Sequence, residues 1–155
     1  AAGPSNGGIE TLVHVGRGYL LAISERQRAG PRALRGWVGV DGDWQDFNYA
    51  RTGSFRPTDA TLLPNGDILV LERRFLLGKG TAIRLVRVPR RAIAPGRTLR
   101  GREIARIAMP MTVDNFEGIG ARPGAAGETL IYLISDNNFN PLQRTLLMMF
   151  SLKGR

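Results

Sequence analysis

The 155-residue chain has no cysteine, so it holds neither disulfide bonds nor thiolate metal sites, an absence that fits both the cytoplasm and a bacterial periplasm. Histidine occurs once, as His14 in an apolar stretch, and there is no Gly-x-Ser-x-Gly motif. A Ser-His-Asp triad would have to use His14, which we instead expect to be a packed or edge residue of a strand.

Long hydrophobic runs are also absent. No stretch reaches about 18 apolar residues, so no segment is predicted to span a bilayer, and none of residues 1–155 is predicted to form a cleavable signal peptide. The chain begins with Ala1 rather than Met, which indicates a processed or truncated start. Its length and its 43% hydrophobic content suit one domain, residues 1–155, with a core of its own.

Lysine is scarce, at positions 79 and 153 only, so the net charge of +9 comes almost wholly from arginine. Guanidinium groups bind phosphates in a bidentate fork, and one interpretation is a polyanion-binding surface. The other is a G+C-rich genome that favours arginine codons, with the charges solvated at the surface. Because the arginines are spread along the chain without a nucleic-acid-binding motif, nucleic acid is the least favoured partner.

Short runs of leucine and β-branched residues, bounded by glycine, proline and asparagine, predict an all-β fold, and helix signals are nearly absent. One pattern occurs three times: an acidic residue, an apolar run, a turn, a second apolar run and another acidic residue. The copies are residues 10–25, 59–72 and 117–136. Their first acids, at positions 10, 59 and 117, are 49 and 58 residues apart, close to the roughly 40 to 50 residues of a propeller blade.

Each copy is therefore predicted to be one blade of a β-propeller-like fold, with about three four-stranded blades. The expected strands are 10–15, 19–24, 36–41 and 46–50 in the first blade, 59–63, 67–72, 82–88 and 103–107 in the second, and 117–121, 129–135 and 144–152 in the third. Residues 89–102, rich in arginine and proline, are expected to be an exposed connection.

The third blade lacks a strand, and a propeller typically needs about 4 to 8 blades to close. Either an N-terminal half of the same protein completes the ring, or another copy pairs with the chain, or the sheets form an open stack. We favour the first interpretation, in which residues 1–155 are the C-terminal half and the missing N-terminal part supplies the fourth strand of the last blade.

In each hairpin the first acid begins a strand and the second ends the next, so both are expected at the end opposite the turn. The predicted pairs are Glu10 with Glu25, Asp59 with Glu72, and Glu117 with Asp136, all at one mouth of the central channel. Crowded carboxylates raise one another's pKa unless a cation or an arginine neutralises them.

Two solutions to this crowding are open. Arg26, Arg73 and Arg74 directly follow two of the acids, whereas Ca²⁺ would add Asn115, Asn137 and Asn138 as neutral oxygen ligands. The simpler alternative is that the acids only cap strand ends and bind amides of the loops. No EF-hand or metalloprotease spacing is present.

Three stretches near the C-terminal end are Asp114-Asn-Phe-Glu-Gly-Ile-Gly120, Leu130-Ile-Tyr-Leu-Ile-Ser-Asp-Asn-Asn-Phe139 and Gln143-Arg-Thr-Leu-Leu147. They resemble the C-terminal end of the phytase-like esterase domain family. Residues 6–10 (NGGIE), 21–25 (LAISE) and 64–73 (PNGDILVLER) resemble its earlier repeats.

Members of this family are mostly bacterial, exported, β-propeller-like proteins of around twice this length, so the resemblance implies a periplasmic or secreted protein. It also implies ester or phosphoester hydrolysis, with acidic clusters that hold Ca²⁺ and activate water. The catalytic positions it implies are Glu10, Glu25, Asp59, Glu72, Glu117 and Asp136. The implied metal ligands are Glu117, Asp136 and Asn137, and the arginines implied to face a phosphate are Arg26, Arg73 and Arg144.

The first functional hypothesis is an extracytoplasmic phosphoesterase or esterase that acts on a phosphorylated or esterified small molecule with a bound divalent cation. The alternative is a non-catalytic binding or scaffold propeller in which the same acids only fix loops. Propellers host both roles, so the fold alone does not separate them.

Overall fold

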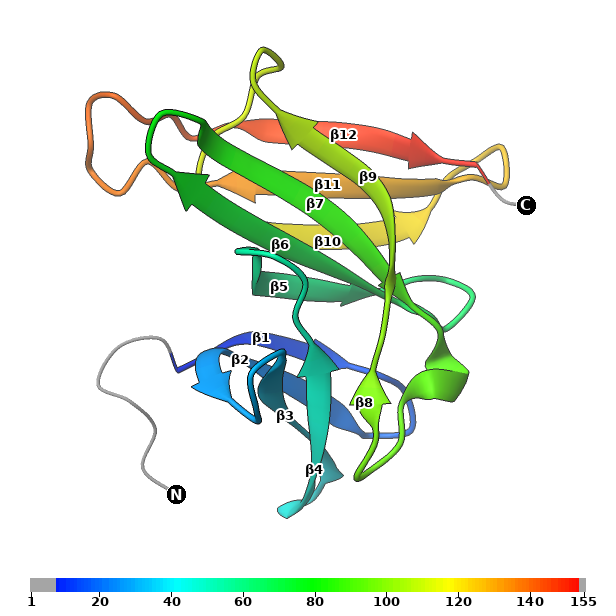
Figure 1. Ribbon diagram of the computed structural model, residues 1–155. Helices are drawn as coiled ribbons and strands as arrows, with labels where there is room; N and C mark the ends of the chain where they lie inside the picture. Colours follow the sequence, from blue (N-terminus) through cyan, green and yellow to red (C-terminus); the bar gives the residue numbers. More distant parts are fainter. Residues whose placement is uncertain (1–7, 154–155) are drawn as a thin grey trace.

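The computed structural model describes residues 8–153, which form three β-sheets and no α-helix (Figure 1). Sheet 1 contains β1 (Ile9–His14), β2 (Leu20–Arg28), β3 (Ala33–Val40), β4 (Asp43–Ala50) and the short β8 (Thr98–Leu99). Sheet 2 contains β5 (Arg56–Leu62), β6 (Ile68–Leu76), β7 (Gly80–Val88) and β9 (Arg102–Ala108), and sheet 3 contains β10 (Phe116–Pro123), β11 (Thr129–Ser135) and β12 (Leu147–Leu152). The prediction of an all-β, propeller-like fold is confirmed.

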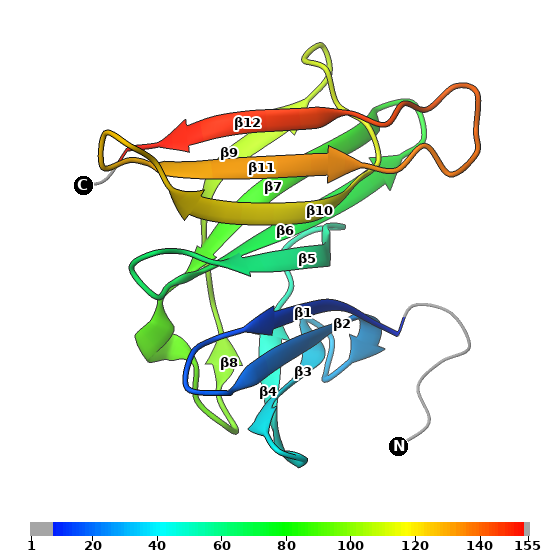
Figure 2. The ribbon, with the colours of Figure 1, turned by 180° about the vertical axis from the view of Figure 1, so that it is seen from behind.

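The sheets follow one another like successive blades. The first strands of the three sheets, β1, β5 and β10, lie side by side at their common inner edge, with β5 in contact with both of the others (Figure 2). They run in the same direction and therefore begin at the same end of the stack, on the left in Figure 1. The described residues form no closed barrel.

Sheet 2 is covered on both faces, which explains why Ile68, Leu69, Val70 and Leu71 form an unbroken apolar run. Ile68 and Val70 pack into a first core against sheet 1, and Leu69 and Leu71 pack into a second core against sheet 3. Alternate residues of a strand point to opposite faces, so a strand between two sheets needs apolar residues at every position. Each such side chain contributes roughly 1.5 to 3 kcal/mol by its burial.

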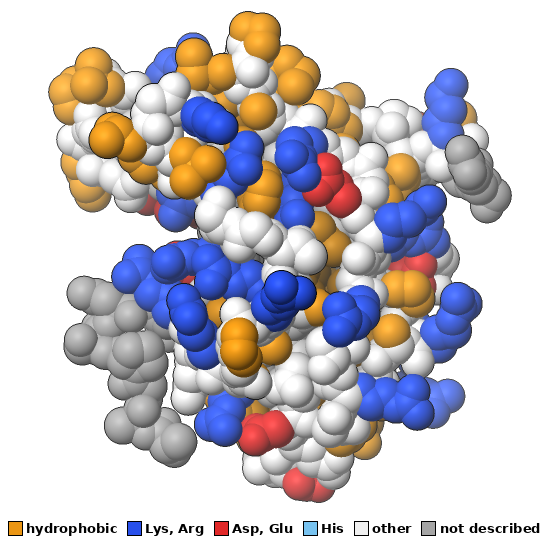
Figure 3. Space-filling model, in the orientation of Figure 1, with side chains coloured by type: hydrophobic (Ala, Val, Ile, Leu, Met, Phe, Trp, Pro, Cys, Tyr) orange, Lys and Arg blue, Asp and Glu red, His pale blue; other side chains and the backbone are white. Residues whose placement is uncertain are grey.

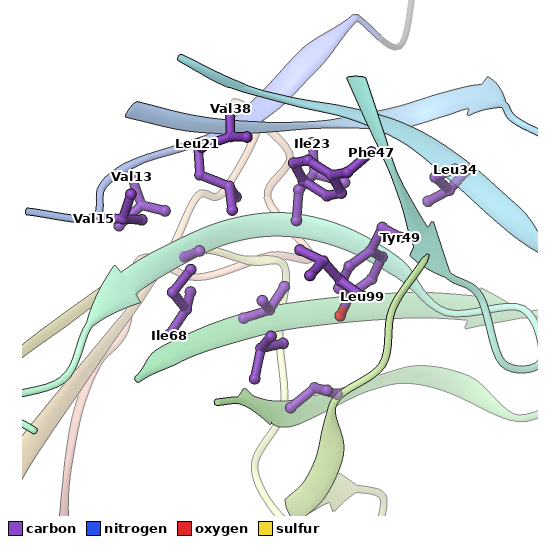
Figure 4. Close-up of a cluster of buried hydrophobic side chains, with 14 residues drawn as sticks. Val13, Val15, Leu21, Ile23, Leu34, Val38, Phe47, Tyr49, Ile68 and Leu99 are labelled. Carbon is purple, nitrogen blue, oxygen red and sulfur yellow. The ribbon is translucent and has the colours of Figure 1, made fainter. Parts of the chain in front are cut away.

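The first core is the larger of the two. Figure 4 shows side chains of β1 to β4, among them Leu21, Ile23, Phe47 and Tyr49, facing the strands of sheet 2. Gly36 on β3 lies opposite Phe47 on β4, and a Cβ atom at Gly36 would overlap the phenyl ring. The ring thus occupies the space above the glycine.

All eleven expected strands are present, with ends that differ by up to four residues. Two short elements inside the predicted connection were missed: the 3₁₀ helix η1 (Arg90–Ala92) and β8, which pairs with β4 in parallel. Leu99 of β8 is 1% exposed and belongs to the first core, so the connection from β7 to β9 crosses to sheet 1 and returns. A two-residue strand is too short to produce a periodic signal. Most other residues between 89 and 102 are exposed or half-buried, as expected.

Sheet 3 has three strands, as predicted. Its completion by an N-terminal part of the protein or by a second copy stays a prediction. In residues 8–153 no helix is long and apolar enough to cross a membrane.

Candidate functional site

The first strand of each sheet carries a β-bulge close to its start. Ile9 lies opposite Ser24, Pro57 opposite Glu72 and Phe116 opposite Ser135, and the register of each strand shifts directly afterwards. The extra residues are Glu10, Thr58 and Glu117. A bulge re-aims the side chain that it carries, and these three positions are equivalent in the three sheets.

The bulges change which residues of sheet 2 correspond to the acid pairs. Thr58 takes the place of Glu10 and Glu117, and Arg73 takes the place that Glu25 and Asp136 hold in the other sheets. Asp59 lies opposite Leu71, so the structure does not form the expected pair of Asp59 with Glu72. An alignment of the repeats by their acids misses the one-residue offset of the second copy.

Asp59 and Glu72 instead tie neighbouring sheets together. Asp59 Oδ2 accepts a hydrogen bond from the backbone N–H of Ile119 in sheet 3 at 2.8 Å. Burial raises the pKa of Asp59, although the backbone hydrogen bonds from Ile119 and Ala60 oppose this rise. Glu72 is 2% exposed, accepts a hydrogen bond from the Tyr49 hydroxyl of sheet 1 and forms an ion pair with Arg84.

Glu10, Glu25 and Glu117 gather where the first strands begin, and we call these three residues the carboxylate rim. Burial raises the pKa of Glu10, and the negative charges of Glu25 and Glu117 add to this rise, while Arg73 and Arg26 oppose it. Arg73 Nη2 lies 3.5 Å from Glu117 Oε1, and Arg26 Nε donates a hydrogen bond to Glu25 Oε2 at 2.8 Å. Arg26 and Arg73 therefore partly neutralise the negative charge of the rim.

The last predicted acid, Asp136, directly follows β11. Its backbone N–H donates to the Asn115 carbonyl at 3.0 Å. Its carboxylate accepts a hydrogen bond from the Asn138 N–H at 3.0 Å, and Asn137 Oδ1 accepts one from the Phe139 N–H at 3.1 Å. Such bonds to the backbone two residues ahead are turn-forming, so this loop is held by its own side chains.

Asn115 is the candidate ligand whose surroundings point most clearly to a cation. It is 2% exposed, its Nδ2 donates to Glu117 Oε1 at 2.7 Å, and its Oδ1 is buried with no hydrogen-bond partner in residues 8–153. An amide oxygen and a neighbouring carboxylate are ligands of the kind that Ca²⁺ prefers, but Ca²⁺ is coordinated by about six to eight oxygens. In the described part of the chain no group of three or more acidic or histidine side chains could hold a metal ion. Asn115 Oδ1 and the Glu117 carboxylate fit Ca²⁺ as oxygen ligands, and water, backbone or substrate oxygens would have to supply most of the others.

Two of the three arginines predicted at the substrate come together. Arg26 and Arg73 line a pocket of about 360 Å³ between sheets 1 and 2. Arg51, Arg56 and Arg74 also line this pocket, which we call the arginine pocket. Figure 3 shows arginine and lysine side chains gathered on the left of the molecule, between the lower sheet and the upper two. Glu25 of the carboxylate rim also lines this pocket.

The third predicted arginine, Arg144, lies elsewhere. Its backbone N–H donates to Asp114 Oδ2 at 3.1 Å, and its Nε lies 3.7 Å from the same oxygen. Asp114 is 9% exposed and was not among the expected site residues. The signal that could have found it is its position at the start of the stretch Asp114–Gly120. His14 is exposed on β1, an edge strand of sheet 1, which agrees with the expectation of an edge histidine.

Comparison with protein families gives one match: the Phytase-like family, described as esterase-like activity of phytase, matches residues 1–139 of the 155. This range contains the carboxylate rim, the arginine pocket and Asp136. It also contains Asn6 and Gly7 of the N-terminal motif, which lie outside the described residues. No curated protein and no solved structure matches the chain. Since the family match covers most of the chain, the chain belongs to the phytase-like family.

Proposed function

We propose that this protein is an exported, extracytoplasmic hydrolase that cleaves a phosphorylated or esterified small molecule at the carboxylate rim. The observation that carries the proposal is that the rim and the arginine pocket adjoin each other. Glu25 belongs to both, and Arg73 lines the pocket while it pairs with Glu117 at 3.5 Å. Groups able to activate water therefore adjoin groups able to hold an anion, and membership of the phytase-like family supports this chemistry.

In this proposal the acidic residues activate water and hold the cation, and the arginines neutralise the negative charge of the substrate. Glu10, whose pKa is raised by burial and by Glu25 and Glu117, is suited to take a proton from an attacking water. Arg73 and Arg26 neutralise negative charge on the group that is transferred. Glu117 would hold a divalent cation, together with the buried Asn115 Oδ1 beside it and with Asp136 and Asn137 on the neighbouring loop. When bound, such a cation lowers the pKa of a water ligand.

The test is hydrolysis of p-nitrophenyl phosphate and p-nitrophenyl acetate by the purified protein, with added Ca²⁺ or with a chelator. We expect Ca²⁺-dependent turnover, a loss of about 100-fold or more in Glu117→Gln, and weaker Ca²⁺ binding by that variant. Glu128→Gln is the matched control, because Glu128 lies at the turn end of the same β10–β11 hairpin, near Ala126. No turnover of either compound, together with unchanged Ca²⁺ binding in Glu117→Gln, would overturn the proposal.

A second candidate is a non-catalytic binding or scaffold propeller. Asp59 binds the Ile119 amide, Glu72 pairs with Arg84 and Asp136 binds the Asn138 amide, which are the contacts that purely structural acids make. If the protein is a non-catalytic propeller, Glu117→Gln should leave its affinity for any ligand unchanged and alter only its stability. The same variant therefore separates the two functions.

A further inference from the structure

Exposed apolar side chains gather on three segments at one end of sheets 2 and 3. The strand pairing places the β6–β7 turn, the β9–β10 loop and the β11–β12 loop at the end where β5 and β10 begin. We call residues 75–80, 109–113 and 136–146 of these segments the apolar loops. Their large exposed apolar residues are Phe75, Leu77, Met109, Met111, Phe139 and Leu142. Figure 3 shows hydrophobic side chains concentrated at the top and upper left, where Figure 1 places these loops.

The first two apolar loops touch each other. A Cβ atom at Gly80 would lie 3.2 Å from Met109 Sδ, so the β9–β10 loop lies against the β6–β7 turn. Leu77, in that turn, is 94% exposed. Scattered apolar residues are ordinary on a protein surface, whereas apolar residues that gather on adjoining loops form a patch, and such a patch marks an interaction site.

The third apolar loop holds its two largest apolar side chains in solvent. Phe139 and Leu142 are 101% and 90% exposed and belong to neither core. The loop is nevertheless ordered by its own hydrogen bonds: Asn140 Oδ1 accepts one from the Leu142 N–H at 3.0 Å, and Asn138 Nδ2 donates to Gln143 Oε1 at 3.1 Å. Phe139 has a φ of 55°, a left-handed conformation that few bulky residues adopt. The loop thus presents Phe139 outward.

The charge around the apolar loops is positive. Lys79 is exposed in the β6–β7 turn, and Arg144 is exposed in the β11–β12 loop. Phe75 also lines the arginine pocket, so the apolar surface continues directly into the five arginines there. Asp136 is the one acidic residue within residues 75–80, 109–113 and 136–146. Apolar tips beside basic groups complement a surface that is negatively charged outside and apolar beneath.

We propose that the apolar loops are a membrane-docking surface that inserts into the headgroup region of a bilayer containing anionic phospholipids. In such binding the apolar side chains enter the boundary between headgroups and acyl chains, while lysine and arginine are attracted to the negative surface. A protein partner fits less well, because a stable protein interface packs a continuous surface of about 800 Å² per partner, whereas these side chains project from separate loops. The inference goes beyond hydrolysis at the carboxylate rim and does not rest on it.

The experiment is sedimentation of the protein with vesicles of phosphatidylcholine, alone or with about 30% phosphatidylglycerol, at about 150 mM salt. We expect binding to the anionic vesicles and at least about tenfold weaker binding to the neutral ones. The double variant Phe139→Ser with Leu142→Ser is expected to bind anionic vesicles about tenfold more weakly or worse. Lys79→Gln is expected to weaken the binding by about fivefold. Circular dichroism checks that each variant is folded.

The matched controls change the same kinds of residue at the opposite end of the strands. Trp44→Ser removes an exposed aromatic side chain beside the β3–β4 turn, and Lys153→Gln removes the lysine that follows β12. Each control is expected to change vesicle binding by less than about twofold. A further variant, Phe139→Trp, reports insertion directly, because its added fluorescence should shift to the blue when the indole enters the membrane interface.

The inference is overturned if the protein does not bind anionic vesicles, or if the double variant binds them as tightly as the parent protein. It is also overturned if Trp44→Ser weakens binding as much as the double variant does, or if the emission of Phe139→Trp does not shift. Self-association that the double variant abolishes, in a protein that binds no vesicles, would assign the apolar loops to contacts between copies of the chain and would likewise overturn it.

Discussion

The Tyr49 hydroxyl of sheet 1 donates a hydrogen bond of 2.7 Å to Glu72 Oε1 of sheet 2, and both residues are 2% exposed. Burial and the negative charge of Glu72 hold the pKa of Tyr49 well above its usual value, so the phenol remains a donor. Glu72 also pairs with Arg84, whose Nη2 donates to Thr52 Oγ1 at 2.6 Å. This buried network joins sheets 1 and 2 through the side chains of Tyr49 and Glu72.

Breaking the network at its charged centre is expected to be costly. Glu72→Gln removes the closer of the two carboxylates that pair with the buried Arg84 guanidinium and leaves only Glu103, at 3.5 Å, and we expect a loss of about 3 to 5 kcal/mol in the free energy of unfolding. Tyr49→Phe removes one donor to a buried carboxylate and should cost about 1 to 3 kcal/mol. Urea denaturation measures both changes.

Tyr132→Phe is the control for the tyrosine, because the Tyr132 hydroxyl accepts its hydrogen bond from Arg122 at an exposed position. We expect it to change the free energy of unfolding by less than about 0.5 kcal/mol. Equal losses for Tyr49→Phe and Tyr132→Phe would show that the buried hydroxyl contributes no more than a surface one.

A second prediction concerns Gly36, whose missing side chain leaves room for the Phe47 ring. Gly36→Ala places a Cβ atom 2.3 Å from Cζ of Phe47, so the ring must move within the first core, and we expect a loss of about 1 to 3 kcal/mol. Gly120→Ala is the control, since Gly120 also lies in a strand and a Cβ there meets nothing within 4 Å. Thermal denaturation that ranks the two variants alike would contradict this packing.

The strands could be predicted because their signal is local. Residues 68–71 and 130–134 each form an apolar run, and the turn residues Asn65 and Gly66 mark the hairpin between β5 and β6. The pairing of Glu10 with Glu25 followed from hairpin geometry, and Glu117 joins them because the first strands of successive sheets lie side by side, as a propeller-like arrangement predicts.

The remaining features depend on contacts that no local pattern contains. Asp59 lies one residue after the bulge of its strand, whereas Glu10 and Glu117 are themselves bulge residues, and the partners of Glu72 lie 23 and 12 residues away along the chain. The arginine pocket draws on three separate segments, residues 25–26, 51–58 and 73–75, so its members look scattered in the sequence. Packing of one sheet against the next creates these features.

A third prediction concerns the link between sheets 2 and 3. Asp59→Ala removes the acceptor for the Ile119 N–H, and the free amide should exchange with solvent faster. The expected loss of stability is about 1 to 3 kcal/mol. Hydrogen exchange followed by NMR checks this residue by residue, with the amide of Ile23 in sheet 1 as the internal control. An unchanged exchange rate at Ile119 would contradict the contact.

The last prediction is a dependence of stability on pH that originates at Asp67. Burial acts to raise the pKa of Asp67, but hydrogen bonds from the Arg90 backbone N–H, the Arg87 guanidinium and Asn65 outweigh it and hold the pKa below its usual value. The folded state thus binds this proton more weakly than the unfolded chain does. The stabilisation is fully present above the pKa of an unfolded aspartate, about 3.9, and is lost as the pH falls through the lower folded value.

Asp67→Asn should therefore be less stable than the parent protein at pH 7, by about 1 kcal/mol, and the difference should shrink as the pH falls below about 4. Urea denaturation at pH 7, 5 and 3 measures this difference. Asp43→Asn, at an exposed position of β4, is expected to show little difference from the parent at pH 7. A protonated Asp67 no longer attracts Arg87, so the stability difference between parent and Asp67→Asn should be smaller at pH 3 than at pH 7. If the difference is the same at both pH values, the shape of the turn rather than the charge of Asp67 stabilises this hairpin.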